Sequence, residues 1–308
     1  MRFGLFGGAT AHNNGHVSDS QHYRAFIDYV VEAEALGFHS AFLVAHHFTG
    51  IGQVSASLNL LTYLAARTTR MRLGTAVVVL PWHNPVLLAE QAATLDLLSD
   101  GRFDFGIGRG YRPNEFDGFC VPIEEAEERY QECVTILKRA MSSTTRFSHH
   151  GKRWHYEDII VEPPVVQRPH PPLWLGAFSD RSVRDAAEQG FNLLLDQRAD
   201  PETVGARVAA YRDMVEGKGR AFDPMSVAVA RAFCLARTPE EREAAHRARA
   251  DFTLGVNQIG SNKGKANLNP NRPQTLDDSK RLTEVNALIG PPEEIIGRLK
   301  RLEAMGVR

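Results

Sequence analysis

Short apolar segments alternate with amphipathic helical segments along the whole chain. The apolar segments are nearly continuous, which is typical of parallel strands that are buried on both faces of a sheet. The stretch after Ser18 instead repeats its apolar positions at helical spacing, and Ser18 and Gln21 match a capping-box pattern at its start. Strands are predicted at residues 2–6, 40–44, 72–80, 103–107, 173–175, 192–195 and 226–235.

Later helix starts are marked by a capping residue followed by proline, at Asn84-Pro85, Asp200-Pro201 and Thr238-Pro239. The capping side chain accepts hydrogen bonds from free backbone N–H groups, and proline suits the first helical turn. Each of these starts comes a few residues after a predicted strand. A strand, a short loop and a helix repeated in one direction predict either a (β/α) barrel or an open doubly wound sheet.

The first loop decides between these two architectures. An open sheet normally carries a Gly-rich phosphate loop after its first strand, with an acidic residue about 20 positions further on. Here Gly7 and Gly8 lead into the polar turn 9–15, which does not match. We therefore predict an α/β fold in which residues 1–308 form a single (β/α)8 TIM barrel. Two insertions are expected, a hairpin with a Pro-rich return at about 142–172 and a mobile lid at about 256–281.

The C-terminal end of the chain departs from the full repeat. The last predicted helix stops at Gly306, a helix terminator after which a strand is expected, and only Val307 and Arg308 follow. The predicted barrel therefore has its eighth strand cut short at the C-terminus.

Composition and charge exclude several classes of protein. The 36 Lys and Arg residues nearly balance the 37 Asp and Glu residues, and no basic stripe is visible, which argues against nucleic acid and anionic membranes as partners. No stretch approaches the roughly 18 apolar residues of a membrane span, and the N-terminus lacks a signal-peptide pattern. The cysteines Cys120, Cys133 and Cys234 form no CxxC motif, so neither a disulfide framework nor a thiolate zinc site is predicted. We expect a cytoplasmic protein.

Polar residues follow three of the predicted strands, where a barrel builds its active site. His46 and His47 follow the second strand and would point to opposite faces of extended backbone, so they do not readily share one metal ion. One of them could transfer protons, and a purely structural role for both is an equal alternative. No set of His, Asp and Glu at successive strand ends suits a divalent ion, so no metal site is predicted.

The other two places suit an anionic or flat ligand. Three glycines alternate with Ile107 and Arg109 after the fourth strand, and they would let the backbone approach a ligand while Arg109 binds an anion. Ser179 and Ser182 bracket a helix start after the fifth strand, where free N–H groups favour an anion. A simple N-cap explains one of these serines equally well.

These motifs resemble the luciferase-like flavin monooxygenases, the family that includes the α subunit of bacterial luciferase. The matching segments are MRFGLF, LVAHHFTGIG, residues 72–111, RPHPPLWLGAFS and ALIGPPEEIIGRLKRLEAMGV. The resemblance implies a (β/α)8 barrel that binds reduced FMN or a related deazaflavin. It also implies a homodimer, because family members commonly dimerise through the helices beside strands two and three.

The resemblance assigns roles to individual residues. His46 matches the catalytic histidine, and His47 matches its neighbour, taken as a substrate-binding residue. Many members have glutamate where this chain has Ala45, and Phe178 replaces an acidic residue of luciferase. Ala76 and Val77 match a pair that members join by a cis peptide bond. The implied cofactor contacts are Ala76, Val77, Gly108, Arg109, Tyr111, Arg129, Ser179 and Ser182.

The reaction that the resemblance implies is a monooxygenation of a small organic substrate. Reduced FMN, supplied by a separate flavin reductase, would react with O2 to give a flavin hydroperoxide, while His46 moves protons or holds the geometry of the peroxide. Two alternatives remain open, a deazaflavin-dependent hydride-transfer oxidoreductase and a flavin-binding partner subunit without catalysis.

Overall fold

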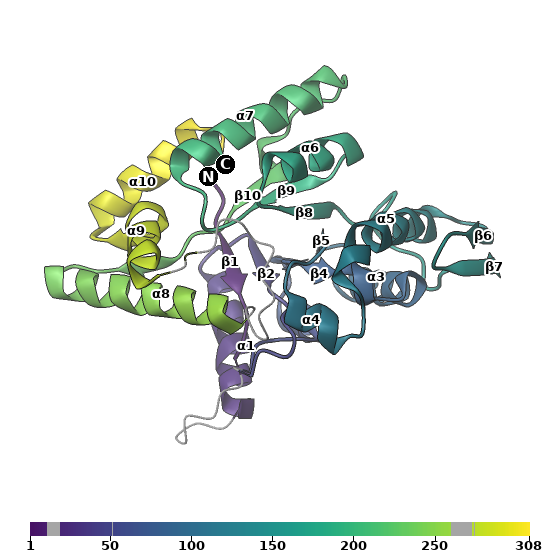
Figure 1. Cartoon of the computed structure of the whole chain (residues 1–308), viewed down its shortest axis with the longest axis horizontal. Helices are drawn as coiled ribbons and strands as arrows, with labels where there is room; N and C mark the ends of the chain where they lie inside the picture. Colours follow the sequence, from purple (N-terminus) through teal and green to yellow (C-terminus); the bar gives the residue numbers. More distant parts are fainter. Residues whose placement is uncertain (11–18, 51, 260–272, 274) are drawn as a thin grey trace. The chain divides into compact units, whose positions relative to one another are not determined.

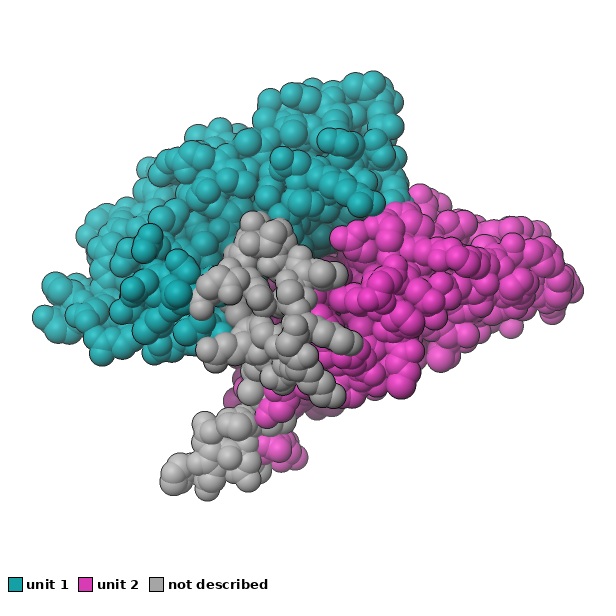
Figure 2. Space-filling model, in the orientation of Figure 1, with its two compact units in different colours: residues 1, 175–308 teal, residues 2–174 magenta. Residues whose placement is uncertain are grey.

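The computed structural model describes residues 1–10, 19–50, 52–259, 273 and 275–308. The described residues form two compact units (Figure 2). The N-terminal unit comprises residues 2–174, and the C-terminal unit comprises residue 1 and residues 175–308. The predicted lid falls largely on 260–272 and 274, which lie outside the described residues. On either side of that stretch the chain is helical, up to Ile259 and again from Leu276.

The N-terminal unit is built on parallel strands in the order β1, β2, β3 and β5, with the short β4 paired to β5 (Figure 1). All six residues of β5 are buried, which explains why this segment is apolar except for Asp104. The strands are β1 (Gly4–Gly7), β2 (Ser40–Leu43), β3 (Arg72–Thr75), β4 (Val78–Val79) and β5 (Phe103–Gly108).

Helices follow these strands as the sequence pattern predicts. Asn84 caps α3, because its side chain accepts hydrogen bonds from the N–H groups of Val86 and Leu87 at 3.0 and 3.1 Å. An antiparallel pair, β6 (Phe147–His150) and β7 (His155–Ile159), lies where the sequence predicts a hairpin. The helices are α1 (Asp19–Ala35), α2 (Ser57–Arg67), η1 (Leu80–Trp82), α3 (Pro85–Leu98), α4 (Pro113–Gly118), η2 (Ile123–Glu125) and α5 (Ala126–Ser142).

Buried carboxylates tie these elements together. Asp104 of β5 accepts hydrogen bonds from the Arg72 guanidinium at 2.7 and 2.9 Å and from the indole N–H of Trp174 at 3.0 Å. Asp96 in α3 accepts the backbone N–H groups of Val166 and Gln167 at 2.7 and 2.9 Å. Each buried charge therefore has the partners that offset the cost of removing it from water.

The C-terminal unit continues the parallel repeat. β9 pairs with β10 in parallel, and β11 pairs with β12 in a separate parallel ladder. Asp200 and Thr238 cap their helices as predicted, Asp200 by accepting the N–H of Thr203 at 2.7 Å. The division between the units falls within β8 (Leu173–Ala177). The elements that follow it are α6 (Asp180–Gln189), β9 (Asn192–Leu195), α7 (Pro201–Gly217), η3 (Pro224–Ser226), β10 (Val227–Val229), β11 (Phe233–Leu235), α8 (Pro239–Ile259), α9 (Leu276–Asn286), β12 (Leu288–Gly290) and α10 (Pro292–Ala304).

Two predicted strands are each divided in the structure. Residues 72–80 form β3 and β4 on either side of Ala76 and Val77, which a cis peptide bond joins. Residues 226–235 form β10 and β11, because the chain turns away from β9 after Ala230 and β11 takes β12 as its partner. Val307 and Arg308 follow α10 and belong to no strand. None of the helices within the described ranges has the length and apolar character needed to cross a lipid bilayer.

Candidate active site

One carboxylate holds both histidines that follow β2. Nδ1 of His46 lies 3.0 Å from Oε1 of Glu115, and the backbone N–H of His47 donates to the same oxygen at 3.0 Å. Glu115 belongs to the short helix α4 and is buried. An ionised carboxylate only accepts hydrogen bonds, so Nδ1 of His46 carries the proton and Nε2 is left as an acceptor. Glu115 therefore provides a carboxylate partner for His46 that Ala45 cannot provide.

Burial sets the charge state of this pair. Burial lowers the pKa of His46, and this effect outweighs the opposing hydrogen bond with Glu115. Burial alone would raise the pKa of Glu115, but the hydrogen bonds from His46 and His47 and the charge of Arg112 bring that pKa below its usual value. At neutral pH the pair is therefore a neutral imidazole beside an ionised carboxylate, and Nε2 of His46 can act as a proton acceptor.

Donors without partners lie next to this pair. Arg112 is 2% exposed, and its Nε and Nη1 have no hydrogen-bond partner among the described residues. The amide of Asn114 in α4 is likewise buried without a partner for either its nitrogen or its oxygen within the described ranges. Unsatisfied donors are costly to bury, and a polar ligand would remove that cost. The buried guanidinium of Arg112 and the buried amide of Asn114 are chemically suited to the polar edge of a flavin ring.

The ring of His47 lies in an aromatic cluster. Its centroid is 4.8 Å from that of Phe119 and 5.9 Å from that of Trp82, and Trp82 stacks on Phe119 at 5.0 Å. Phe116 contacts the other side of Trp82 at 5.1 Å. Rings packed in this way form an apolar wall beside the two histidines.

Close packing accounts for the glycines Gly106 and Gly108 of β5. A Cβ atom on Gly106 would lie 1.8 Å from the carbonyl oxygen of Thr75, and one on Gly108 would lie 2.6 Å from a methyl group of Val77. The chain around the cis bond between Ala76 and Val77 thus approaches β5 too closely for larger residues. That cis bond is the one the family resemblance implies.

Both arginines predicted as cofactor contacts, Arg109 and Arg129, pair with glutamates. Nη1 of Arg109 forms an ion pair with Glu127 of α5. Nε of Arg129 donates to Glu125 at 2.9 Å, and Arg153 pairs with the same glutamate at 3.0 Å. Arg129 is thus positioned by Glu125, and its role toward a phosphate stays a prediction. Tyr111 lies beside Arg112, whose guanidinium is 5.6 Å from its ring centroid.

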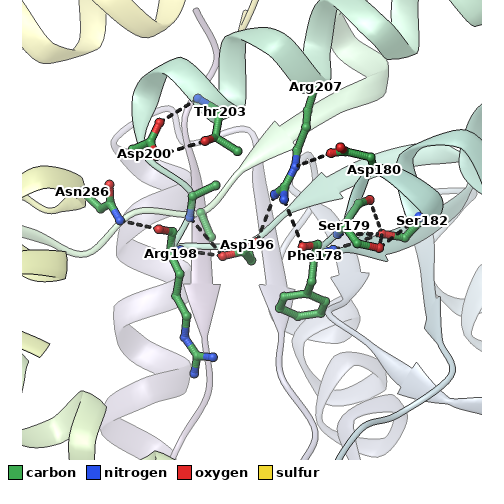
Figure 3. Close-up of polar contacts among 12 residues, drawn as sticks. Phe178, Ser179, Asp180, Ser182, Asp196, Arg198, Asp200, Thr203, Arg207 and Asn286 are labelled. Atoms are coloured by element: carbon green, nitrogen blue, oxygen red, sulfur yellow. Dashed lines mark hydrogen bonds and ion pairs between the residues drawn. The ribbon is translucent and has the colours of Figure 1, made fainter. Parts of the chain in front are cut away.

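In the C-terminal unit, Ser179 and Ser182 form the capping box of α6 (Figure 3). The N–H of Ser182 donates to Oγ of Ser179 at 3.3 Å, and the N–H of Ser179 donates to Oγ of Ser182 at 3.0 Å. Both serines thus meet at the start of one helix, as the sequence predicts, and their hydroxyls serve that cap in the structure.

No sequence motif indicated the buried arginine beside this helix start. Arg207 of α7 is 8% exposed and donates to the carbonyl of Phe178 at 3.0 Å (Figure 3). Its guanidinium also lies 3.5 Å from the carboxylate of Asp196 and 3.7 Å from that of Asp180. Arg207 therefore fixes the chain at the end of β8 and adds positive charge beside the N-terminus of α6.

No cluster of three or more His, Cys, Asp or Glu side chains suited to a metal ion occurs in the part of the chain that the structure describes.

Known proteins resemble this chain over most of its length. A protein of Sinorhizobium fredii without an assigned function is 30% identical over 70% of this chain, which spans 62% of that relative. The oxygenase component of a flavin-dependent trigonelline monooxygenase from Acinetobacter baylyi is 27% identical, over 99% of this chain and 87% of its own length. An FMNH2-dependent dimethylsulfone monooxygenase from Pseudomonas putida is 29% identical, over 89% of this chain and 78% of its own length.

Solved structures confirm the predicted α/β barrel class. The monooxygenase RslO1 from Streptomyces bottropensis superposes with a TM-score of 0.85 and 26% identity, over 100% of this chain and 90% of that one. An F420-dependent secondary alcohol dehydrogenase shares the fold with a TM-score of 0.75 and 16% identity, over 99% of this chain and 91% of that one. The family model for luciferase-like monooxygenases matches residues 1–308. The chain therefore belongs to the family of luciferase-like monooxygenases.

Proposed function

We propose that this chain is the oxygenase of a two-component system that takes reduced FMN from a separate flavin reductase and uses O2 to oxidise a small organic substrate. The observation that carries the proposal is the His46 and Glu115 pair, with Nε2 of His46 left as an acceptor beside the unpartnered donors of Arg112. The relatives named as an oxygenase component and as an FMNH2-dependent monooxygenase support it. When bound, reduced FMN would supply the electrons that activate O2.

Each group of the site has a part in this proposal. Glu115 orients His46 and keeps the proton on Nδ1, so that Nε2 can take up or return a proton at the reacting atoms. The rings around His47 exclude water from the reaction and would contact an apolar substrate. The implied cofactor contacts Ala76, Val77, Gly108, Arg109, Tyr111 and Arg129 would hold the flavin, and the cap formed by Ser179 and Ser182 would receive its phosphate.

A titration separates this proposal from deazaflavin-dependent hydride transfer. FMN and the deazaflavin F420, each reduced and kept free of air, are titrated separately into the protein while fluorescence is followed. We expect reduced FMN to bind more tightly, and tight binding of reduced F420 without binding of reduced FMN would overturn the proposal. Binding of reduced FMN without any oxygenation across a substrate panel would instead support a non-catalytic partner subunit.

His46→Ala tests the role of the imidazole. We expect the variant to bind reduced FMN like the unchanged protein, because His46 is proposed to act on protons rather than to hold the cofactor. The product formed per reduced FMN oxidised should fall by about 10²-fold, in the range of general acid–base catalysis, with peroxide released instead. An unchanged product yield would remove His46 from the mechanism.

A further inference from the structure

The C-terminal unit contains a partly enclosed cavity of about 70 Å³. Gln197 and Arg198 line it from the loop after β9, and Ala232 lines it from the segment after β10. The facing sides of α8 and α9 form the rest of its wall. The cavity therefore lies beyond the carboxyl ends of β9 and β10, and it also borders the starts of β11 and β12. The carboxyl ends of parallel strands are a common place for ligand binding in α/β proteins.

Two arginines, Arg198 and Arg249, line this cavity, and its described lining contains no Asp or Glu. Arg249 of α8 donates to the side-chain oxygen of Gln197, which is a neutral partner. Burial lowers the pKa of Arg249, and the positive charge of Arg198 lowers it further. The guanidinium also lies 5.4 Å from the ring centroid of Phe252, so its partners given by the described residues, Gln197 and Phe252, are both neutral. A half-buried guanidinium with such partners favours an anion, and its planar pair of donors matches a carboxylate.

An unpartnered acceptor lies in the same cavity. Asn286 is 5% exposed, and its amide nitrogen donates to the carbonyl oxygen of Arg198 at 2.5 Å. Its Oδ1 has no hydrogen-bond partner among the described residues, so a donor from a ligand would satisfy it. Phe252, Val256 and Leu282 add an apolar wall.

We propose that this cavity binds the carboxylate end of a small organic acid that also carries an O–H or N–H donor. Arg249 receives the carboxylate, and Oδ1 of Asn286 receives the donor. The volume is well below the roughly 300–1,000 Å³ of complete ligand pockets, so the cavity holds one end of the molecule rather than a whole cofactor.

Calorimetric titration of the full chain tests the binding step. The probes are benzoate, its three hydroxybenzoate derivatives, neutral benzamide and inorganic phosphate. We expect benzoate to bind at least about tenfold more tightly than benzamide, the factor that a charge-assisted hydrogen bond provides. At least one hydroxybenzoate should bind more tightly than benzoate, because its hydroxyl reaches Asn286. The proposal fails if no carboxylate binds, if benzamide binds equally well, or if phosphate is preferred.

Variants locate the site. Arg249→Met should weaken benzoate binding at least about tenfold, whereas Arg249→Lys should retain part of it. Arg247→Met is the matched control, because Arg247 lies on the same helix and pairs with Glu243 on the exposed face. Equal benzoate affinity in Arg249→Met and the unchanged protein would overturn the site, and the Lys variant keeps this test valid if the Met variant does not fold.

Reduced FMN binding, measured on the same variants, separates the two proposals. We expect Arg249→Met to retain it, since the cavity is not assigned to the cofactor. Carboxylate binding that depends on Arg249 in a protein that never binds reduced FMN would leave the cavity established and the proposed oxygenase function wrong. Normal binding of reduced FMN with no affinity for carboxylates would overturn the cavity proposal and leave the proposed oxygenase function standing.

Discussion

Glu115 holds the two histidines of the candidate site through a single oxygen atom. Glu115→Gln keeps an acceptor in that position and removes the negative charge. Because this charge raises the pKa of His46, the variant should lower that pKa further. We expect the rate of air oxidation of bound reduced FMN to fall by about tenfold. In the pH profile of this rate, the acid-side limb should move to lower pH.

The comparison variant for this prediction is Glu124→Gln, which changes an exposed glutamate of η2. A shift of the acid limb in both variants would show a general charge effect. An unmoved limb in Glu115→Gln would mean that Glu115 serves only to hold the chain, because a purely structural role does not alter the pH profile.

A second prediction concerns His83, the residue before Asn84 at the start of α3. Burial lowers the pKa of His83 to about 4, and the charge of His47 adds to this effect. The unfolded chain binds a proton at His83 at higher pH than the folded chain does, so stability should be lost as pH falls from about 6.5 to 4. The loss amounts to about 3 kcal/mol from this residue.

Urea unfolding at several pH values checks this prediction. His83→Gln should lose less stability than the unchanged protein between pH 6.5 and 4, whereas the exposed His155→Gln should follow the unchanged protein. Parallel stability curves for the unchanged protein and His83→Gln would show that His83 does not contribute to the acid loss.

The sequence identified His46 but not its partner, for a physical reason. The family pattern places a glutamate directly before the two histidines, where this chain has Ala45. The carboxylate comes instead from Glu115, 69 positions away in the helix that follows β5. Only the fold brings the ends of β2 and β5 close together, although the rule that sites gather at strand ends would have made Glu115 a candidate.

At the start of α6, the capping role of Ser179 can be tested separately from its proposed contact with the phosphate of FMN. Ser179→Ala removes the oxygen that accepts the N–H of Ser182, which should cost about 1 kcal/mol of stability. Thr275→Ala removes the corresponding cap of α9, which has the same box with Asp278. We expect both variants to lose similar stability, but only Ser179→Ala to weaken binding of reduced FMN, as measured by fluorescence titration. Equal FMN affinity in the two variants would leave Ser179 as an N-cap alone.

Helix starts were predictable because their chemistry is local. Asn84, Asp200 and Thr238 each bond to N–H groups within three residues, so the sequence alone contains the whole interaction. Strand ends depend on distant partners. β12 was not predicted, since Leu288–Gly290 is only three residues long and becomes a strand through pairing with β11, more than fifty positions earlier.

For the whole molecule, the repeated unit of a strand followed by a helix identified the fold class. In each repeat a short apolar segment, which forms a buried strand, is followed by an amphipathic segment, which forms a helix. The division of the described chain into two compact units was not predicted. It falls within β8, inside an apolar run that has no linker composition to mark a boundary. The substrate is also absent from these patterns, because pocket shape depends on side chains from several separate loops.

The surface of α3 supports the proposed homodimer. Leucine or alanine occupies most positions around this helix, and Leu87 and Leu98 are 54% and 58% exposed in the single chain. Tyr63 on the neighbouring helix α2 is 53% exposed. The exposed side of α3 thus carries leucines beside the polar Gln91 and Thr94, and exposed apolar side chains that lie close together often mark a protein interface. Leu87→Glu would place a charge in such an interface, where it would lack a partner.

We therefore expect light scattering to give twice the chain mass of 34.2 kDa for the unchanged protein and a single chain mass for Leu87→Glu. Leu36→Glu is the control, because Leu36 is 73% exposed but follows α1 and lies on neither α2 nor α3. A dimer that survives Leu87→Glu would place the interface elsewhere, and a monomeric unchanged protein would end the homodimer proposal. Because the candidate site uses no group from α2 or α3, monomeric Leu87→Glu should still bind reduced FMN.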